Sequence, residues 1–369
     1  MNYLKLGPVR IPYKVITNGD TKIFQIMRFK IPFTTIVRDN RKYYRIAGLT
    51  FRLPFLDRYL DKYFINQAKL NFIMNDQLTD EKIRQIAESI FEDKLGYAPD
   101  LDNPKSFNEK IFWMKLNYKN PLVTTCCDKF AVKDYVTEKL GEGFVVPTLA
   151  AWDNPDDVDF SILPEKFVMK VNWSSGYNII VKDKARLNCK EALEKIRFWM
   201  EPQQNSYFQA FNWGYKNMKP VVYAESYMEQ LDGQLYDYKF YCCNGKVKFL
   251  FIATDRHKDG KLTYTFFDTD FNRLPFTYGG RRNAEDIGKP KFFDEMIRCA
   301  EILSQPFPFV RVDFYETENK IFVGEMTFYS GGGILPFNPP EWDYKLGEHI
   351  KLPGNQSRQI RREKNGVNL

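Results

Sequence analysis

The chain has 369 residues, of which 44% are hydrophobic, and its 54 Lys/Arg against 47 Asp/Glu give a formal net charge of +7. This length allows more than one folded core, and no run approaches the roughly 20 apolar residues that cross a bilayer. The first residues also lack the apolar stretch of a signal peptide, so we expect a cytoplasmic protein.

The cysteine and histidine content argues against two kinds of site. The six cysteines include two adjacent pairs but no C-x-x-C spacing of the kind that binds zinc or carries redox chemistry. We therefore expect reduced thiols. The two histidines, His257 and His349, lie outside any cluster of ligands. A Ser-His-Asp triad and a His-rich metal centre are both disfavoured.

The excess positive charge lies in the first 60 residues. This segment holds 12 Lys/Arg and 3 Asp/Glu, whereas the remaining 309 residues hold 42 and 44. A five-residue pattern with a central proline recurs at residues 9–13, 29–33 and 51–55. We predict three β-hairpin-like units in a small basic sheet, with the prolines on edge strands or at strand ends.

Two roles stay open for this basic segment. It is a structural appendage, or it docks an anionic partner such as a membrane surface or an acidic polymer. Nucleic acid is not expected, because no recognisable reading motif is present.

Helical and strand patterns alternate along the rest of the chain. Helices are predicted over residues 79–95, from the capping box Ser106-x-x-Glu109 onward, and over residues 128–140, 191–200 and 294–303. Strands are predicted over residues 145–151, 166–171, 178–182, 221–227, 236–241 and 246–253. In the first helix, Ile83, Ile86, Ala87, Ile90 and Phe91 form one apolar stripe. Residues after about 341 are interpreted as a polar tail.

Residues 309–315 and 321–328 predict a β-hairpin that places Asp313 opposite Glu325. Alternation puts Arg311, Asp313, Glu325 and Thr327 on one polar face. It puts Val310, Val312, Phe314, Phe322, Met326 and Phe328 on the other. Cross-strand Cβ atoms lie roughly 5 Å apart, close enough for two carboxylates to share a divalent cation such as Mg²⁺. The alternative is a solvated sheet face with an Arg–Asp pair.

Two further stretches suggest binding chemistry. The small-residue turn at 172–177 lies between two predicted strands and could fold its backbone N–H groups over phosphates. Asp268-Thr269-Asp270 has the D-x-D form that binds a metal and a nucleotide-sugar diphosphate, although such triplets are common by chance. A glycosyltransferase is therefore an alternative function.

Six sequence motifs occur in an order along the chain that, taken together, is informative about the protein family. They are NEKIFWMKL (108–116), DKFAVKDYV (128–136), PEKFVMKVNWSSG (164–176), AESYMEQ (224–230), DYKFYCCNGK (237–246) and VRVDFYE…FVGEMTFYSGGG (310–333). Together they resemble the ATP-grasp superfamily, and most closely its TupA-like branch of teichuronopeptide and capsular polysaccharide biosynthesis. The resemblance covers residues 106–352, about two thirds of the chain.

The resemblance implies an α+β class protein with the ATP-grasp fold, in which two α+β subdomains clasp ATP. Its expected organisation is a basic β-repeat region at 1–60 and a helical part at 61–165. The small subdomain with the phosphate loop would span 166–229, the catalytic and metal-binding subdomain 230–340, and the tail 341–369.

The resemblance also assigns nucleotide contacts. Lys129 and Lys170 match the basic residues that hold phosphates, and Ser174, Ser175 and Gly176 match the loop that closes over them. Residues 224–228 match the hinge that meets adenine. The hinge set is Glu225, Tyr227 and Met228, with Glu229 placed for the ribose hydroxyls.

The remaining matches concern catalysis and metal binding. Asp237, Lys239, Arg256 and Arg311 match polar residues of the catalytic cleft, with Arg256 stabilising charge on the transferring phosphoryl group or the acyl-phosphate. Asp313 and Glu325, with Thr327 as a weaker third ligand, match the Mg²⁺ site. Many relatives carry Glu-x-Asn where this chain has Glu325-Met326-Thr327, so a second metal is in doubt.

The implied activity is ATP-dependent carboxylate–amine ligation through an acyl-phosphate. The expected substrates are an amino acid or other amine and a carboxylate-bearing cell-surface glycan. Peripheral contact with the inner face of the membrane through residues 1–60 is a hypothesis from charge alone. Besides the glycosyltransferase, the alternatives are a kinase of a glycan or lipid-linked sugar and a non-catalytic nucleotide-binding module.

Overall fold

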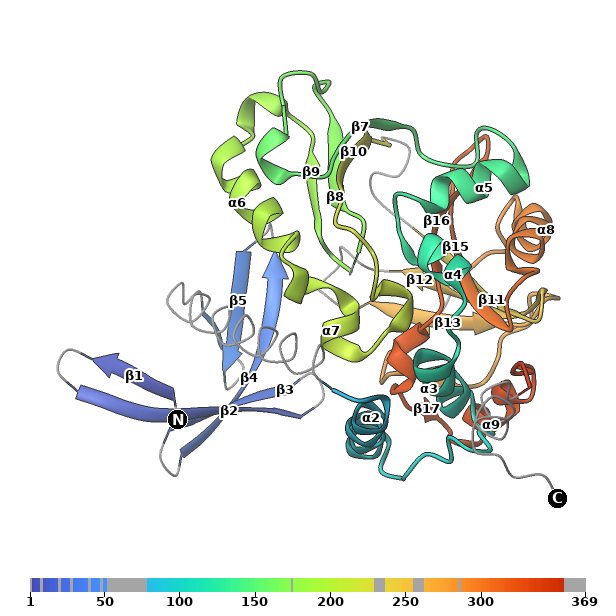
Figure 1. Ribbon diagram of the computed structural model, residues 1–369, viewed down its shortest axis with the longest axis horizontal. Coiled ribbons are helices and arrows are strands. Elements are labelled where there is room, and N and C mark those ends of the chain that lie inside the picture. Colours follow the sequence, from blue (N-terminus) through green and yellow to red (C-terminus); the bar gives the residue numbers. More distant parts are fainter. Residues whose placement is uncertain are drawn as a thin grey trace. The chain divides into compact units, whose positions relative to one another are not determined.

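A computed structural model of the protein describes residues 78–173, 175–228, 236–254, 262–284 and 287–354. It also describes the backbone of six strands within residues 2–51 (Figure 1). The chain divides into two compact units, Met1–Lys69 and Leu70–Leu369. Helices occur together with antiparallel sheets, so the predicted α+β class is confirmed.

The first unit contains one six-stranded antiparallel sheet whose strands follow chain order. They are β1 (Asn2–Leu6), β2 (Val9–Asn18), β3 (Thr21–Ile26), β4 (Phe29–Arg38), β5 (Arg41–Ile46) and β6 (Leu49–Phe51). The predicted hairpin units are therefore parts of one continuous sheet. Of the third repeat, only Phe51 lies within the described residues.

The prolines of the repeat lie where β2 and β4 change partner. The part of β2 up to Tyr13 pairs with β1, and the part from Tyr13 onward pairs with β3. Pro12 lies just before this change, and Pro32 occupies the same place in β4. The prediction of edge strands is wrong for both, because β2 and β4 are interior strands. Each proline pairs on one side only, which tolerates its missing N–H.

The described part of the second unit begins with four helices. They are α2 (Asp80–Leu95), α3 (Phe107–Asn117), α4 (Pro121–Cys127) and α5 (Val132–Leu140). Thr79 caps the start of α2, and Gly96 ends it in the left-handed conformation at φ 81°. The predicted capping box of Ser106 and Glu109 is present at the start of α3.

The helix predicted over residues 128–140 is confirmed from Val132 to Leu140, but its predicted start is wrong. Asp128 instead ends α4, and its carboxylate accepts the N–H groups of Phe130 and Ala131 in a turn before α5 begins. An aspartate that bonds its own following backbone favours such a turn over a continuous helix.

A four-stranded antiparallel sheet follows, with strand order β7-β10-β8-β9. Its strands are β7 (Thr148–Trp152), β8 (Phe167–Val171), β9 (Asn178–Val181) and β10 (Val222–Ser226). Phe167, Met169 and Val171 of β8 are buried, whereas Val168 and Lys170 point to the less buried face. The connection from β9 to β10 contains α6 (Cys189–Trp199), which lies beside β9, and α7 (Ser206–Ala210) (Figure 1).

The second antiparallel sheet of this unit has five strands in the order β13-β12-β11-β15-β16. They are β11 (Asp237–Cys243), β12 (Lys246–Thr254), β13 (Thr263–Phe267), β15 (Phe309–Glu316) and β16 (Ile321–Thr327). Asn244 and Gly245 have φ values of 50° and 76°, so the predicted tight turn between β11 and β12 is confirmed.

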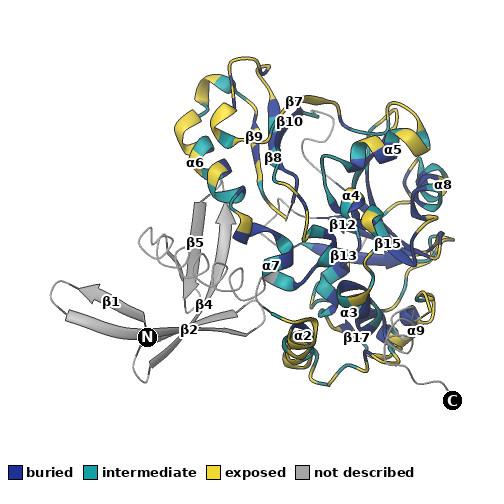
Figure 2. Cartoon of the chain, viewed as in Figure 1, coloured by how far each residue is buried: buried dark blue, intermediate teal, exposed yellow. Residues whose placement is uncertain are grey.

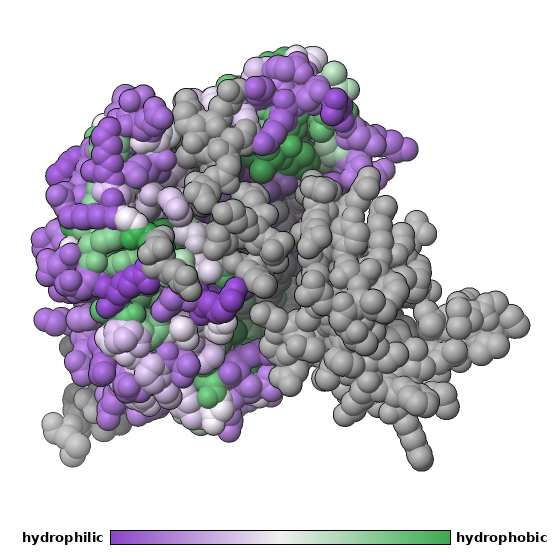
Figure 3. All heavy atoms as spheres, turned by 180° about the vertical axis from the view of Figure 1, so that it is seen from behind, coloured by the Kyte–Doolittle hydropathy of each residue, from purple (hydrophilic) through white to green (hydrophobic). Residues whose placement is uncertain are grey.

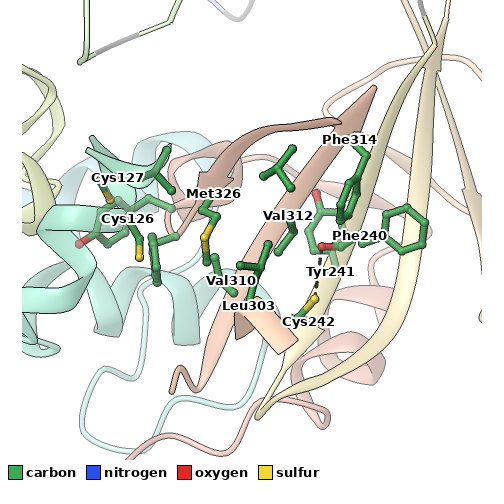
Figure 4. Close-up of a cluster of buried hydrophobic side chains, with 14 of the residues drawn as sticks. Cys126, Cys127, Phe240, Tyr241, Cys242, Leu303, Val310, Val312, Phe314 and Met326 are labelled. Atoms are coloured by element: carbon green, nitrogen blue, oxygen red, sulfur yellow. Dashed lines mark hydrogen bonds between the residues drawn. The ribbon is translucent and has the colours of Figure 1, made fainter. Parts of the chain in front are cut away.

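One face of this sheet is apolar and packs against α8 (Phe293–Ser304). Figure 4 shows Val310 and Val312 of β15 together with Met326 of β16 and Leu303 of α8. The opposite face is polar along β15, β16 and the start of β11. Farther across the sheet it is aromatic, with the buried side chains Tyr241, Phe249, Phe251 and Phe266. Buried residues line the sheets and the inner sides of the helices (Figure 2), whereas polar residues dominate the face seen in Figure 3.

The hairpin of β15 and β16 confirms the predicted pairing of Asp313 with Glu325. A β-bulge at Gly324 then shifts the register, so that Phe314 pairs with Val323 and Tyr315 with Phe322. The placement of Phe322 beside Phe314 is therefore wrong, since strict alternation omits the extra residue. A Cβ at Gly324 would lie 2.8 Å from the Tyr315 ring, which explains the glycine.

Residues 341–354 do not form the predicted tail. The strands β14 (Thr277–Tyr278) and β17 (Phe337–Asn338) pair, and α9 (Glu341–Gly347) packs against α3. The Asp343 carboxylate accepts hydrogen bonds from the backbone N–H and the amide of Asn108, at 2.9 and 3.0 Å. The Lys110 ammonium donates to the carbonyls of Gly347 and Ile350, both at 2.8 Å.

Within the described residues, no helix combines the length and hydrophobicity needed to cross a membrane.

The contact of α9 with α3 generates a stability prediction. A Cβ at Gly347 would lie 2.7 Å from the backbone nitrogen of Phe107 and would also collide with the carbonyl of Lys105. Because backbone atoms cannot rotate away, Gly347→Ala should lower the free energy of unfolding by about 2–3 kcal/mol in urea denaturation. Gly288→Ala is the matched control, since its Cβ would meet nothing within 4 Å. Equal stability of the two variants would contradict this packing.

Candidate functional site

A cleft of about 140 Å³ lies between the less buried face of the four-stranded sheet and the polar face of the five-stranded sheet. Of the predicted site residues, those that line it are Lys129, Lys170, Ser175, Gly176, Asp237, Lys239, Asp313 and Glu325. Residues more than 190 positions apart in the sequence therefore meet in one place.

Strand pairing builds the floor of the cleft. Lys239 of β11 pairs with Asp313 of β15, and Asp313 pairs with Glu325 of β16. One cation and two carboxylates therefore stand in a row across three neighbouring strands. The Lys239 ammonium contacts the Asp313 carboxylate, and its nitrogen lies 3.6 Å from an oxygen of Asp237.

Arg311 holds the two carboxylates of the hairpin together. Its Nε and Nη2 donate to the two oxygens of Asp313 at 2.6 and 2.7 Å, a bidentate contact. Nη2 also reaches Oε1 of Glu325 at 3.1 Å and Oγ1 of Thr327 at 3.0 Å. The guanidinium therefore provides the counter-charge that two adjacent carboxylates need in a buried position.

The two carboxylates differ in their electrostatics. Burial raises the pKa of the Asp313 carboxyl above its usual value, although Arg311 and Lys239 oppose the shift. Burial acts in the same direction on Glu325, but the neighbouring cations, Lys129 foremost, outweigh it and hold its pKa well below the usual value. Glu325 is thus the more firmly ionised of the pair, and its Oε2 lies 3.0 Å from the Lys129 ammonium.

A second charged cluster surrounds Glu225 on β10. Glu225 is 5% exposed. Its carboxylate contacts the ammonium groups of Lys170 from β8 and Lys133 from α5. Burial alone would raise the pKa of Glu225, but the two lysines lower it below its usual value. Sequence reasoning missed Lys133. The local signal is that Lys133 follows Lys129 by four residues in the motif DKFAVKDYV, but this spacing does not reveal partners on other segments.

Asn172 fixes the start of the small-residue turn. Its amide donates to Oδ2 of Asp128 at 2.7 Å and to the carbonyl of Lys219 at 2.8 Å. Its backbone carbonyl accepts the N–H of Lys129 at 3.0 Å. The turn that carries Ser175 and Gly176 is therefore tied to the segment that carries Lys129. Sequence reasoning assigned no role to Asn172 or Asp128.

The less buried face of the four-stranded sheet also carries aliphatic side chains. Val168 pairs with Ile180 on one side and with Glu225 on the other, so the three share a face. Ile180 is 54% exposed on that face. Beyond β10, Tyr227 and Met228 continue the chain, and the Lys182 ammonium lies 5.5 Å from the Tyr227 ring centroid.

Three predicted residues, Ser174, Glu229 and Arg256, lie outside the described residues. The D-x-D triplet belongs to a turn after β13. There the Asp268 carboxylate accepts the N–H groups of Asp270 and Asn272 at 3.0 and 2.8 Å. The Asp268 carboxylate therefore stabilises the turn in which it lies. Asp268 is not among the residues that line the cleft.

Comparisons with known proteins bear on this site. Comparison with curated proteins gave no match. Among solved structures, D-alanine–D-alanine ligase from Bacillus anthracis is 16% identical, with 68% of this chain and 71% of that chain covered and a TM-score of 0.35. The ATP-grasp ligase PsnB in complex with a minimal precursor is 13% identical, with 60% of each chain covered and a TM-score of 0.32.

Carboxyaminoimidazole ribonucleotide synthase from Aspergillus clavatus in complex with ATP is 14% identical, with 58% of this chain and 46% of that chain covered and a TM-score of 0.33. The chain thus spans less than two thirds of the length of that synthase and of PsnB.

The family model described as TupA-like ATPgrasp matches residues 109–351, which is more than half of the chain. This range includes both charged clusters and the hairpin. The family resemblance drawn from the six motifs is confirmed. The chain belongs to the TupA-like ATP-grasp family, within the ATP-grasp ligase superfamily.

Proposed function

We propose that the protein is an ATP-dependent carboxylate–amine ligase that forms an amide through an acyl-phosphate. The observation that carries the proposal is the pair of charged clusters that face one cleft. In each cluster, a lysine contacts a carboxylate whose pKa is held below its usual value. Both lysines, Lys129 and Lys170, line the cleft in which a polyanion would lie.

The phosphates of ATP would lie between Lys129 and Lys170. Phosphate oxygens compete with carboxylates for an ammonium group, because both are anionic hydrogen-bond acceptors. Lys129 would therefore exchange Glu325 for a phosphate, and Lys170 would exchange Glu225. The turn with Ser175 and Gly176 supports this placement, since Gly176 has φ 81° and lines the same cleft.

The adenine would lie on the aliphatic surface of Val168 and Ile180 beside Glu225. Tyr227 and Met228 would meet its edge, and Glu229 would bind the ribose. A cleft of about 140 Å³ is smaller than the roughly 300 Å³ at the low end of ligand pockets. Binding would therefore separate the two sheets from the arrangement described here.

The hairpin has the right donors for Mg²⁺, which prefers oxygen ligands and keeps several waters. Asp313 and Glu325 offer carboxylate oxygens at paired positions, and the Thr327 hydroxyl lies 3.2 Å from Oε1 of Glu325. Within the described residues, no group of three His, Cys, Asp or Glu side chains converges, so the remaining ligands would be phosphate oxygens and water. When bound, the ion would neutralise charge on the ATP phosphates.

Arg311 and Lys239 would stabilise the reaction itself. A substrate carboxylate attacks the γ-phosphorus, the bond to ADP breaks, and an acyl-phosphate forms; the amine then attacks the acyl carbon and phosphate leaves. Negative charge develops on oxygens in both steps, where fixed guanidinium and ammonium groups are effective. Arg256 is proposed to act in the same way. The acceptor is proposed to be a carboxylate-bearing cell-surface polysaccharide, and the amine an amino acid.

One assay tests the function. The protein is incubated with ATP, Mg²⁺, a panel of amino acids and uronic-acid glycans, and ADP, phosphate and products are measured. Release of ADP and phosphate that requires both the amine and the carboxylate supports the ligase. A phosphorylated glycan would instead identify a kinase, and turnover of a nucleotide-sugar without ATP would identify a glycosyltransferase.

Glu325→Gln tests the metal proposal. Gln keeps the shape of Glu325 but removes the charge, so Mg²⁺-dependent ADP release should fall at least 100-fold while the circular dichroism spectrum stays unchanged. Thr327→Val is the graded comparison and should lose far less, because a hydroxyl is a weak ligand. Chelation of Mg²⁺ with EDTA should abolish turnover of the unmodified enzyme. Near-normal activity of Glu325→Gln would remove the assignment.

The basic first unit is proposed to hold the enzyme on an anionic surface, either a glycan or the inner face of the membrane. Deletion of residues 1–69 removes one compact unit. It should abolish co-sedimentation with vesicles that contain 30% anionic lipid and with uronic-acid polymer, and binding of the full chain should weaken as salt is raised. Unchanged sedimentation of the shortened chain with both partners would refute the proposal.

A further inference from the structure

Lys133 makes the most complete set of contacts among the lysines around the cleft. Its ammonium lies 2.8 Å from the carbonyl oxygen of Val146, 2.8 Å from Oγ1 of Thr148 and 2.6 Å from Oε1 of Glu225. An ammonium group has three N–H donors. All three are used, and they reach the segment that leads into β7 as well as β10.

The two lysines proposed to bind phosphate differ from Lys133. The Lys170 side chain is 28% exposed and contacts Oε2 of Glu225, whereas the Lys133 side chain is 12% exposed. Lys129 is 22% exposed and contacts Glu325. Lys170 lines the phosphate end of the cleft, and Lys133 does not. Lys133 is therefore placed to stay where it is when a nucleotide arrives.

Glu225 needs this arrangement because it is buried. If Lys170 left Glu225 for a phosphate and Lys133 were absent, no ammonium group of the described residues would contact this buried carboxylate. Removing one partner of a buried ion pair in this way is strongly destabilising, because it leaves an uncompensated buried charge. Lys133 supplies the second ammonium on the other carboxylate oxygen, so the charge of Glu225 stays compensated.

We propose that Lys133 is a positioning residue that retains the charge balance of Glu225 and thereby allows Lys170 to transfer to the nucleotide phosphates. This inference rests on the proposed nucleotide site and adds to it a residue that does not itself touch the nucleotide. Lys133 also joins α5 to the strands β7 and β10, so the segment with Lys129 and the strand with Glu225 keep a fixed relation.

Among the described residues, the charged groups that act on Glu225 are Lys133 from α5 and Lys170 from β8, and both lower its pKa. Once Lys170 is engaged by phosphate, Lys133 is the remaining ammonium at Glu225. Removal of Lys133 should therefore raise the pKa of Glu225 in the nucleotide complex. Protonation of Glu225 would then begin at a higher pH, and the site would lose the carboxylate beside the adenine.

Lys133→Met tests the proposal in the full chain. The side chain lines a groove of about 560 Å³ between α5 and residues 145–148, so methionine has room. Calorimetric titration with Mg²⁺–ADP from pH 5 to pH 8 should show affinity about tenfold weaker than in the unmodified protein. The acidic limb of the affinity profile should also move to higher pH. A purely structural role would weaken binding equally at every pH.

Two comparisons make the result decisive. Lys139→Met on the same helix removes an exposed lysine that pairs with Glu138 at 2.8 Å, and it should bind Mg²⁺–ADP normally. In a Glu225→Gln background there is no charge to compensate, so adding Lys133→Met should change affinity less than twofold. Lys133→Gln, which keeps an N–H donor, serves if the methionine variant does not fold.

The outcomes separate the two proposals. No binding of Mg²⁺–ADP or Mg²⁺–ATP by the unmodified protein would overturn the nucleotide site itself. Normal binding by the unmodified protein together with an unchanged affinity and pH profile in Lys133→Met would overturn only the role of Lys133. A tenfold loss that persists in the Glu225→Gln background would also overturn it, because the effect would not act through Glu225.

Discussion

A carboxylate that is removed from water needs hydrogen-bond donors or a counter-charge, and in the described part of the second unit cations hold two such carboxylates at the cleft. Asp313 is 3% exposed and is held by Arg311 and Lys239. Glu225 is 5% exposed and is held by Lys133 and Lys170. Isolated, either charge would cost several kcal/mol to bury. The two sheets can therefore pack around this cleft only because cations from α5, β8, β11 and β15 converge on these carboxylates.

The surrounding scaffold fixes these charges more firmly than their own ion pairs do. Antiparallel pairing sets Lys239, Asp313 and Glu325 in one row, since each strand position has one partner on the next strand. The reverse face of this hairpin packs against helices, with β15 against α8 and β16 against α4 and α5, and this packing holds the row in place. The lysines are longer and more flexible, so they are the groups that can change partner. Carboxylates in fixed positions and lysines that can change partner are together suited to binding a negatively charged ligand.

Much of this could be predicted from the sequence where the signal is local. The hairpin pairing of Asp313 with Glu325 follows from alternation and turn length, and the cap of α3 follows from Ser106 and Glu109. Features that depend on contacts between distant parts of the sequence could not be predicted. The bulge at Gly324 depends on the ring of Tyr315 opposite, which alternation cannot reveal. Ile90 fits the apolar stripe of α2 yet is 37% exposed, because the described residues leave that side of the helix uncovered. The partners of Lys133 lie on other segments, so its spacing from Lys129 alone did not identify it.

The change of partner within β2 and β4 has a consequence for how the first unit grows. Next to the proline of each repeat, the strand stops pairing with the strand before it and starts pairing with the strand after it. A further repeat of about 20 residues would therefore add strands to the sheet and leave the existing strand pairs unchanged. Residues 9–28 carry four Lys/Arg against one Asp, so each unit also brings a fixed increment of positive charge. Duplication or loss of one unit would therefore tune the charge of the sheet in steps, independently of the enzyme to which it is joined.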